Sequence, residues 1–193
     1  MLIVGLTGSI GMGKSTTSAM FRQAGVAVHD SDLAVHELYA STAIDPIEKA
    51  FPGVVENGAV NRNALASRVL QDGTALQRLQ EIVHPLVQAH RSAFLSRARS
   101  AGVPLCVLDI PLLFETNAEN AVDAIIVVTA PYHVQKQRVM SRRGMTEAKF
   151  QAILSKQMTD AHKRLRAHWI IDTSLGVESA NRQVLGVLRA SGR

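Results

Sequence analysis

The sequence predicts an α/β fold with a parallel sheet that helices cover on both faces. Five short apolar runs have the length of buried strands, and most of them precede segments in which apolar residues recur at helical spacing. Strands that are apolar throughout are typical of parallel sheets, because helices pack on both faces of such sheets. The expected strands are residues 2–6, 26–28, 105–108, 124–128 and 169–171.

The stretch between the second and third expected strands is much longer than a connection requires. A crossover between parallel strands needs only about a dozen residues, whereas residues 33–102 carry apolar positions at helical spacing over most of their length. Gly53, Gly58 and Gly73 interrupt the stretch, and we expect Pro85 to kink or end one of its helices. The sequence therefore predicts one domain, residues 1–193, that contains a helical insertion.

A glycine-rich segment, GSIGMGKS at residues 8–15, follows the first expected strand. It matches the pattern G-x-x-x-x-G-K-[ST], with Gly8, Gly13, Lys14 and Ser15 at the fixed positions. Glycine lets successive backbone N–H groups turn inward around an anion, and the helix that begins near Gly13 directs its unpaired N–H groups at the same anion. We predict a phosphate-binding loop in which Lys14 reaches the β and γ phosphates and Ser15 binds Mg²⁺. The alternative is a strand-to-helix turn with an incidental lysine.

Two acidic residues, Asp30 and Asp32, follow the second expected strand. They lie at the carboxyl end of that strand, which is the edge of a parallel α/β sheet where ligands bind. Either carboxylate could orient an attacking hydroxyl group and accept its proton, or help to hold Mg²⁺ through water. Alternatively, Ser31 or Asp32 caps the following helix. Asp109 directly follows the third expected strand, where a role on Mg²⁺ through water and a structural role both remain open.

The net charge of +5 is concentrated in residues 131–168, which carry a charge of +7. Only Glu147 and Asp160 oppose the nine basic residues of this segment, which are Lys136, Arg138, Arg142, Arg143, Lys149, Lys156, Lys163, Arg164 and Arg166. Aromatic residues make up 4% of the chain, which offers little for base stacking, so a polyphosphate partner is favoured over nucleic acid. Arg138 and Arg142 are expected on one helix face, where they and the later basic residues could close over phosphates.

These features together resemble the dephospho-CoA kinase family, over nearly the whole chain. The resemblance rests on TGSIGMGKS at 7–15, DSD at 30–32, EIVHP at 81–85, DIPLLFE at 109–115, QM at 157–158, KR at 163–164 and IID at 170–172. It implies a P-loop kinase-like three-layer α/β fold with a five-stranded parallel sheet. It also implies a helical acceptor-binding insertion at about 33–102 and a helical lid at about 138–166.

The resemblance also implies an activity, which is transfer of a phosphoryl group from ATP to the ribose 3′-hydroxyl of dephospho-CoA, with Mg²⁺ as cofactor. Lys14 and Asp32 would be catalytic, together with Arg138 and Arg142 of the lid. The implied ATP site consists of Gly11, Met12, Gly13, Lys14, Ser15 and Thr16, with Ser15 on the metal. The implied acceptor site consists of Asp32, Arg62, His84 and Leu113.

One position departs from the family pattern. The family usually has an acid or an amide before the last strand, where this chain has Ala167, His168 and Trp169. The departure leaves a polar role at position 168 open, although it does not touch the expected chemistry.

Cysteine content and hydropathy favour a cytoplasmic protein. Cys106 is the single cysteine, so no disulfide can form within the chain. Gly5 and Gly8 interrupt the apolar start far short of the ~20 residues that span a bilayer, and we expect neither a secretory signal nor a transmembrane helix. We expect the small molecules ATP and dephospho-CoA as partners, with no nucleic acid and no membrane. A monomer is expected, with an oligomer left open.

Three alternatives remain at this stage. A nucleoside monophosphate kinase would share the phosphate-binding loop and a lid. A nucleotide-dependent switch protein would bind nucleotide without an acceptor, although a guanine-reading Asn-Lys-x-Asp motif is missing from the sequence. An RNA-binding protein would use the basic segment, and its affinity would depend steeply on salt.

Overall fold

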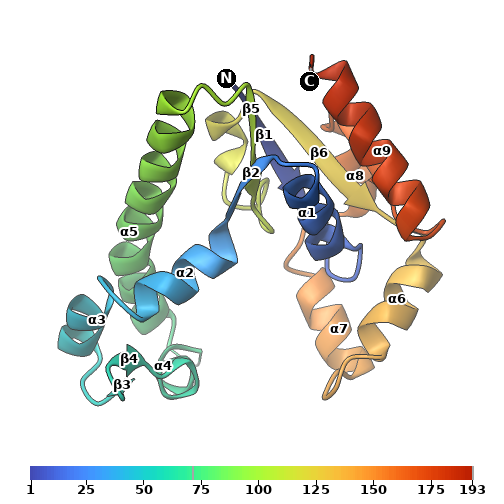
Figure 1. The fold of residues 1–193 in the computed structure, drawn as a ribbon. Helices are drawn as coiled ribbons and strands as arrows, with labels where there is room; N and C mark the ends of the chain where they lie inside the picture. Colours follow the sequence, from blue (N-terminus) through green and yellow to red (C-terminus); the bar gives the residue numbers. More distant parts are fainter. Residues whose placement is uncertain (71, 193) are drawn as a thin grey trace. The chain divides into compact units, whose positions relative to one another are not determined.

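The computed structural model describes residues 1–70 and 72–192. At least one helix lies between each strand of the five-stranded sheet and the next such strand along the chain, as an α/β fold requires (Figure 1). In chain order the elements are β1 (Leu2–Thr7), α1 (Lys14–Gln23), β2 (Ala27–Asp30), α2 (Ser31–Tyr39), α3 (Ile44–Ala50), β3 (Val55–Glu56), β4 (Ala59–Val60), α4 (Arg62–Val69), α5 (Gly73–Ser100), β5 (Leu105–Asp109), the 3₁₀ helix η1 (Ala118–Ala121), β6 (Ala124–Thr129), α6 (Tyr132–Met140), α7 (Glu147–Leu154), α8 (Asp160–Leu165), β7 (Trp169–Asp172) and α9 (Val177–Ala190).

The five expected strands form one parallel sheet in the order β2-β5-β1-β6-β7, which confirms the predicted sheet. The strand β1 is central, and it pairs with β5 on one side and β6 on the other. Each strand runs one or two residues beyond its apolar run and ends on a polar residue, so polar side chains collect at the carboxyl edge of the sheet. These residues are Thr7, Asp30, Asp109, Thr129 and Asp172.

The core of this part of the molecule lies between the sheet and two helices. Phe21 of α1 and Val184 and Leu188 of α9 pack with the apolar residues of the central strands. In Figure 1 the helices α1 and α9 lie side by side against the sheet. Burial of these side chains stabilises the packing of α1 by roughly 25 cal/mol per Å² of apolar surface removed from water. The helix α1 in turn positions the glycine-rich segment before it.

The chain divides into two compact units. The first consists of Met1–His29 and Ala98–Arg193 and contains most of the sheet, and the second is Asp30–Arg97. The second unit has its own apolar core, which includes Leu38, Ile47 and Phe51. The sequence analysis assigned functions to parts of the chain: a single kinase domain, an acceptor-binding insertion and a lid. These assignments stay predictions.

Two details of the second unit differ from the sequence analysis. The helix α5 continues through Pro85, so this proline does not end a helix. The short antiparallel strands β3 and β4 were not predicted, because each has only two residues. Asn57 and Gly58 join them, and both adopt the positive φ that two-residue hairpin turns require.

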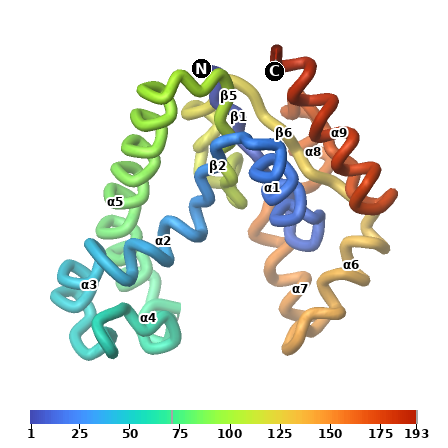
Figure 2. Tube along the Cα trace, in the orientation of Figure 1, coloured from blue at the N-terminus to red at the C-terminus, as the bar shows by residue number. Residues whose placement is uncertain are grey.

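The helices α6 and α7 form two arms joined by the turn 141–146 (Figure 2). Phe150 of α7 stacks on Tyr132 of α6, with ring centroids 6.2 Å apart. Because α6 ends at Met140, Arg142 lies in the turn, where its backbone N–H donates to the carbonyl of Val139. The prediction that Arg138 and Arg142 share one helix face is therefore wrong. Among the residues that the structure describes, no helix is both long enough and apolar enough to cross a membrane.

Candidate active site

Residues 8–13 form a loop between β1 and α1, and the packing around Gly8 and Gly11 leaves little room for side chains. A Cβ atom on Gly8 would lie 2.7 Å from the carbonyl oxygen of Val128. Gly11 has a φ of 79°, and a Cβ atom there would lie 2.5 Å from Cγ2 of Val139. Both positions favour glycine, because a Cβ atom would press on backbone at Gly8 and the positive φ at Gly11 strains other residues. The spacing seen in the sequence is therefore a packing requirement of the loop.

The helix α1 begins without a capping side chain. Its N-cap residue, Gly13, has no side chain to accept the N–H groups of the first turn, and this turn contains no acidic residue. The unpaired N–H groups at the head of α1 and the positive end of its dipole favour an anion. Ser15 and Thr16 are exposed in this first turn. The head of α1 is therefore suited to an anion.

Lys14 contacts the acid that ends the neighbouring strand. Its Nζ atom lies 2.5 Å from Oδ1 of Asp109, whose side chain is 1% exposed. The ammonium group of Lys14, the first residue of α1, thus lies against a buried carboxylate at the end of β5. The sequence analysis left the role of Asp109 open, and the structure brings this residue into the site.

Residues far away in the sequence hold the loop from outside. The sulfur of Met12 accepts a hydrogen bond from the backbone N–H of Ala130, at 3.1 Å, and the carbonyl of Met12 accepts one from the hydroxyl of Thr173, at 2.8 Å. Arg138 donates to both the hydroxyl and the carbonyl oxygen of Thr173, at 2.8 and 2.7 Å. The guanidinium group of Arg138 is thus bound within the fold, and its action on phosphates stays a prediction.

Several other basic residues of the segment 131–168 are paired with acids, so this segment is less electropositive than its sequence indicates. Lys163 is fully buried, with its Nζ atom 2.8 Å from Glu115. Arg164 lies 3.2 Å from Asp160, and Arg166 lies 2.6 Å from Glu119. Their grouping as free cations that close over phosphates is therefore revised. Arg142, by contrast, is exposed in the turn after α6, and its catalytic role stays a prediction.

Glu115 belongs to the segment DIPLLFE and joins two parts of the first unit. Its Oε1 atom accepts the backbone N–H of Met158, at 2.8 Å, in addition to the contact with Lys163. Burial opposes the ionisation of Glu115, but the contacts with Lys163 and with backbone N–H groups outweigh it, so the pKa of Glu115 lies below its ordinary value. The structure therefore brings together three of the segments that carried the family resemblance, at 109–115, 157–158 and 163–164.

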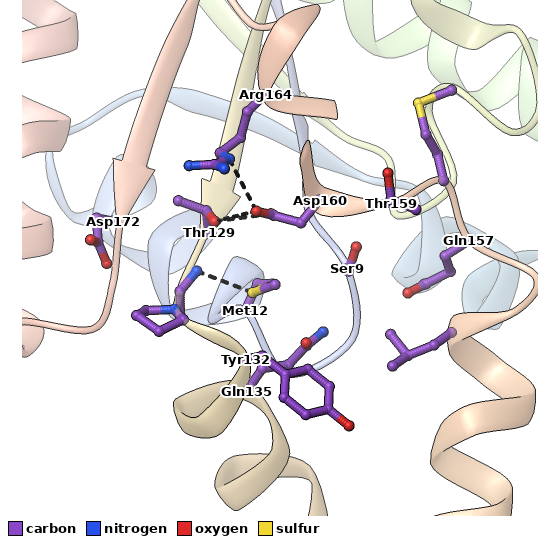
Figure 3. Close-up of a pocket in the computed structure, with 14 residues that line it drawn as sticks. Ser9, Met12, Thr129, Tyr132, Gln135, Gln157, Thr159, Asp160, Arg164 and Asp172 are labelled. Carbon is purple, nitrogen blue, oxygen red and sulfur yellow. Dashed lines mark hydrogen bonds and ion pairs between the residues drawn. The ribbon is translucent and has the colours of Figure 1, made fainter. Parts of the chain in front are cut away.

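A cavity of about 480 Å³ lies beside the loop (Figure 3). Figure 3 shows that its lining comes from the loop, from the carboxyl ends of β6 and β7, from α6 and from the segment around α8. Asp160 lies in its wall, where its carboxylate accepts a hydrogen bond from Thr129, at 2.9 Å, and pairs with Arg164. Gln135 and Gln157 also line the cavity. Both apolar and polar groups therefore border the open space next to the phosphate-binding loop.

Asp32 lies in the second unit, in the first turn of α2. The N-cap of α2 is Asp30, whose carboxylate accepts the backbone N–H groups of Asp32 and Leu33, both at 3.1 Å. The alternative that Ser31 or Asp32 caps this helix is therefore wrong. Because Asp30 provides the cap, the exposed carboxylate of Asp32 is not required for it.

The predicted acceptor residues have different surroundings. In the second unit, Arg62 is exposed at the start of α4, and His84 is exposed on α5. Burial raises the pKa of Tyr39 in the same unit, and the charge of Arg62 offsets part of this rise. In the first unit, Leu113 is 0% exposed and packs next to Gly5. In this position Leu113 supports the sheet, and contact between Leu113 and the acceptor stays a prediction.

Sequence reasoning missed Thr173 and Gln135, which contact the loop directly. Neither residue belongs to a phosphate-binding motif. Each side chain binds a backbone carbonyl group of the loop, and such a contact leaves no pattern in the sequence. His168, the departure from the family pattern, has a structural role, because its Nδ1 atom accepts the backbone N–H of Ile125 in β6, at 3.2 Å.

Comparison with known proteins agrees with this geometry. A family model described as dephospho-CoA kinase matches residues 2–178. A protein of Mesorhizobium japonicum named dephospho-CoA kinase is 56% identical over 188 residues, which cover 97% of this chain and 95% of that protein.

Solved structures share the fold of this chain. The crystal structure of a Thermus thermophilus protein is 34% identical, with a TM-score of 0.85 over 98% of this chain and 96% of that one. The dephospho-CoA kinase of Campylobacter jejuni, at 21% identity, shares the fold, with a TM-score of 0.69 over 98% of this chain and 96% of that one. The chain belongs to the dephospho-CoA kinase family.

Proposed function

We propose that this chain transfers the γ-phosphoryl group of ATP to the ribose 3′-hydroxyl of dephospho-CoA and releases coenzyme A and ADP. The observation that carries the proposal is the uncapped head of α1, with Lys14 beside it, in a chain of this family. A phosphate group fits this place because backbone N–H groups, a helix dipole and an ammonium group all favour the same negative charge.

The residues 11–16 bind ATP in this proposal. The N–H groups at the head of α1 bind the phosphate oxygens, while Lys14 neutralises charge on the β and γ groups. Phosphoryl transfer passes through a loose transition state, so positioning and electrostatic stabilisation supply most of the catalysis. A loop that is already rigid, with its glycines packed against β6 and α6, suits this requirement.

Asp32 orients the acceptor in this proposal. Its carboxylate accepts the hydrogen bond of the ribose 3′-hydroxyl and takes its proton as the oxygen attacks the γ phosphorus. The bond between the γ phosphorus and the bridging oxygen breaks, and ADP leaves with the electron pair. Two observations support the assignment: Asp32 follows the carboxyl end of β2, and capping of α2 does not use its carboxylate.

The oxygen donors near Lys14 suit Mg²⁺. Ser15 presents a hydroxyl group in the first turn of α1, and Asp109 is a carboxylate at the end of β5. Mg²⁺ prefers such hard ligands and commonly uses only one or two from the protein, with water and substrate phosphates completing its shell. We propose that Ser15 holds Mg²⁺ directly and Asp109 through water. When bound, the ion neutralises charge on the β and γ oxygens.

The remaining assignments rest on the family resemblance. Arg62 and His84 bind the acceptor in this proposal, together with Asp32 and Leu113. Arg138 and Arg142 act from the lid, which closes and excludes water. The substrates are small molecules, the enzyme acts as a monomer, and the place of action is the cytoplasm.

A substrate panel tests the proposal. Purified protein is mixed with ATP and Mg²⁺, and ADP release is measured with dephospho-CoA and separately with each common nucleoside monophosphate. We expect rapid turnover with dephospho-CoA and a product that is heavier by one phosphoryl group. Turnover confined to a nucleoside monophosphate would replace this function with that of a nucleotide kinase. Slow hydrolysis that no acceptor stimulates would favour a nucleotide-dependent switch.

A further inference from the structure

Side chains from two distant segments bind both backbone polar groups of Ile10, the third residue of the loop. Its N–H donates to Oε1 of Gln157, at 3.1 Å, and its carbonyl accepts from Nε2 of Gln135, at 2.7 Å. The two glutamines therefore hold the peptide groups on either side of Ile10 from two directions. Rotation of either peptide group would break one of these hydrogen bonds.

Gln135 is a rigid support for the loop. It lies on α6, and its side chain is 3% exposed. The same helix packs on the next residue of the loop, because a Cβ atom on Gly11 would lie 3.0 Å from the carbonyl oxygen of Gln135. A buried donor in a helix that is already in contact with the loop has little freedom to move away from Ile10.

Gln157 is held independently of the loop. It lies between α7 and α8, and the next residue, Met158, donates its N–H to Glu115, which also contacts the buried Lys163. Gln157 therefore links the segment that follows β5 to the phosphate-binding loop. Figure 3 shows Gln135 and Gln157 approaching the cavity beside the loop from separate segments.

We propose that Gln135 and Gln157 are positioning residues for phosphoryl transfer, which hold the Ile10 peptide groups so that the loop keeps its N–H groups directed at the phosphates. The inference rests on the proposed function and adds two residues to it, which act through the backbone of the loop. The physical reason is preorganisation, because donors that are already oriented need no reorganisation when charge develops in the transition state.

The two positions need opposite chemistry, which gives a sharp test. Position 157 must supply an acceptor to the Ile10 N–H, and position 135 must supply a donor to the Ile10 carbonyl. Gln157→Glu keeps an acceptor but adds a negative charge near the phosphate site, whereas Gln135→Glu removes the donor. Gln157→Met and Gln135→Met remove the hydrogen bonds at similar side-chain length.

The experiment measures kcat, the KM of each substrate, ATP affinity by calorimetry, and thermal stability for these variants. Gln157→Met and Gln135→Met should each lose about tenfold in kcat/KM for ATP, the scale of one hydrogen bond whose buried partner is left unpaired. The KM for dephospho-CoA should stay unchanged. Gln157→Glu should keep kcat and bind ATP more weakly at low salt, and high salt should restore its affinity because ions screen the added charge. High salt should not rescue Gln157→Met.

Gln183→Met is the matched control. Gln183 binds the N–H and the carbonyl of Asp172 in the same manner, at 2.9 and 2.8 Å, but this residue lies outside the loop. The control should lower thermal stability without a specific loss in kcat/KM for ATP. Wild-type kinetics in both Gln→Met variants, or an equal kinetic loss in Gln183→Met, would overturn the inference. A wild-type enzyme that is inactive on dephospho-CoA would instead refute the proposed function.

Discussion

The phosphate-binding loop and the start of α2 hold their functional groups in opposite ways. The backbone of the loop is bound by side chains that lie 125 to 161 residues away in the sequence, those of Gln135, Gln157 and Thr173. The start of α2 relies on a local contact, because Asp30 caps the helix in which Asp32 lies two residues later. The difference teaches that the loop depends on the fold of the whole first unit, whereas Asp32 needs only a short helix to present its carboxylate.

The largest expected effect comes from the remote support of the loop. Lys163→Ala removes a fully buried cation from the carboxylate of Glu115, whose side chain is 14% exposed, which should lower the free energy of unfolding by about 3 kcal/mol. Lys136→Ala is a matched control, because Lys136 forms an exposed pair with Glu147, at 2.9 Å, and its loss should cost at most about 1 kcal/mol. Denaturant unfolding of both variants measures the difference, and equal losses would mean that Lys163 gives no special support.

The same buried pair has a pH signature. The pKa of Glu115 in the folded protein lies below its ordinary value of 4.5, because the contacts with Lys163 and with backbone N–H groups outweigh the opposing effect of burial. Its stabilising contribution is complete above that ordinary value and disappears as the pH falls through the lower folded-state pKa. The double variant Glu115→Gln, Lys163→Met should therefore lose less stability on acidification than the wild type does.

The next effect concerns the loop itself. Lys14→Ala removes the ammonium group beside the head of α1, and we expect kcat to fall by about 10² to 10³-fold, the scale of one lost charge-stabilising donor. ATP affinity should also fall, which calorimetry measures. Because Lys14 and Asp32 have separate tasks, the variant should still bind dephospho-CoA. Unchanged kcat and unchanged ATP affinity would contradict the assignment of Lys14 to the phosphates.

The smallest effect tests the local support of α2. Asp30→Ala removes the N-cap of α2 and should lower stability by about 1 kcal/mol. Asp30→Asn should lose much less, because asparagine caps helices well. Thermal unfolding measures both variants. Equal losses would show that the charge of Asp30 matters more than its capping hydrogen bonds.

Much of the sheet could be predicted because its central strands are buried on both faces and are therefore apolar along most of their length. The strand ends were set one or two residues too early, since Thr7, Asp109 and Asp172 are polar and carry no apolar signal. The two strands β3 and β4 were missed at two residues each, although Asn57 and Gly58 marked their turn. Periodicity identifies long elements better than short ones.

The site divides in the same way. The spacing of Gly8, Gly13 and Lys14 predicted an anion site, which stays a prediction. The structure does show close packing around Gly8 and Gly13, which gives a physical reason for glycine at these positions. Gln135 and Thr173 could not be found, because their hydrogen bonds depend on a packing that unites distant segments. The charge of the segment 131–168 was overestimated for the same reason. Glu115 and Glu119, which pair with basic residues of this segment, lie outside it in the sequence.

The measurement that tests the account most directly is the turnover of Asp32→Asn with dephospho-CoA, combined with its ATP affinity and compared with Asp30→Asn. We predict that kcat of Asp32→Asn falls by about 10² to 10⁴-fold, the scale of a lost general base, while ATP affinity stays close to that of the wild type. Asp30→Asn should keep both. Near-normal turnover of Asp32→Asn would contradict the claim that phosphate binding and acceptor activation are separate tasks of the two regions.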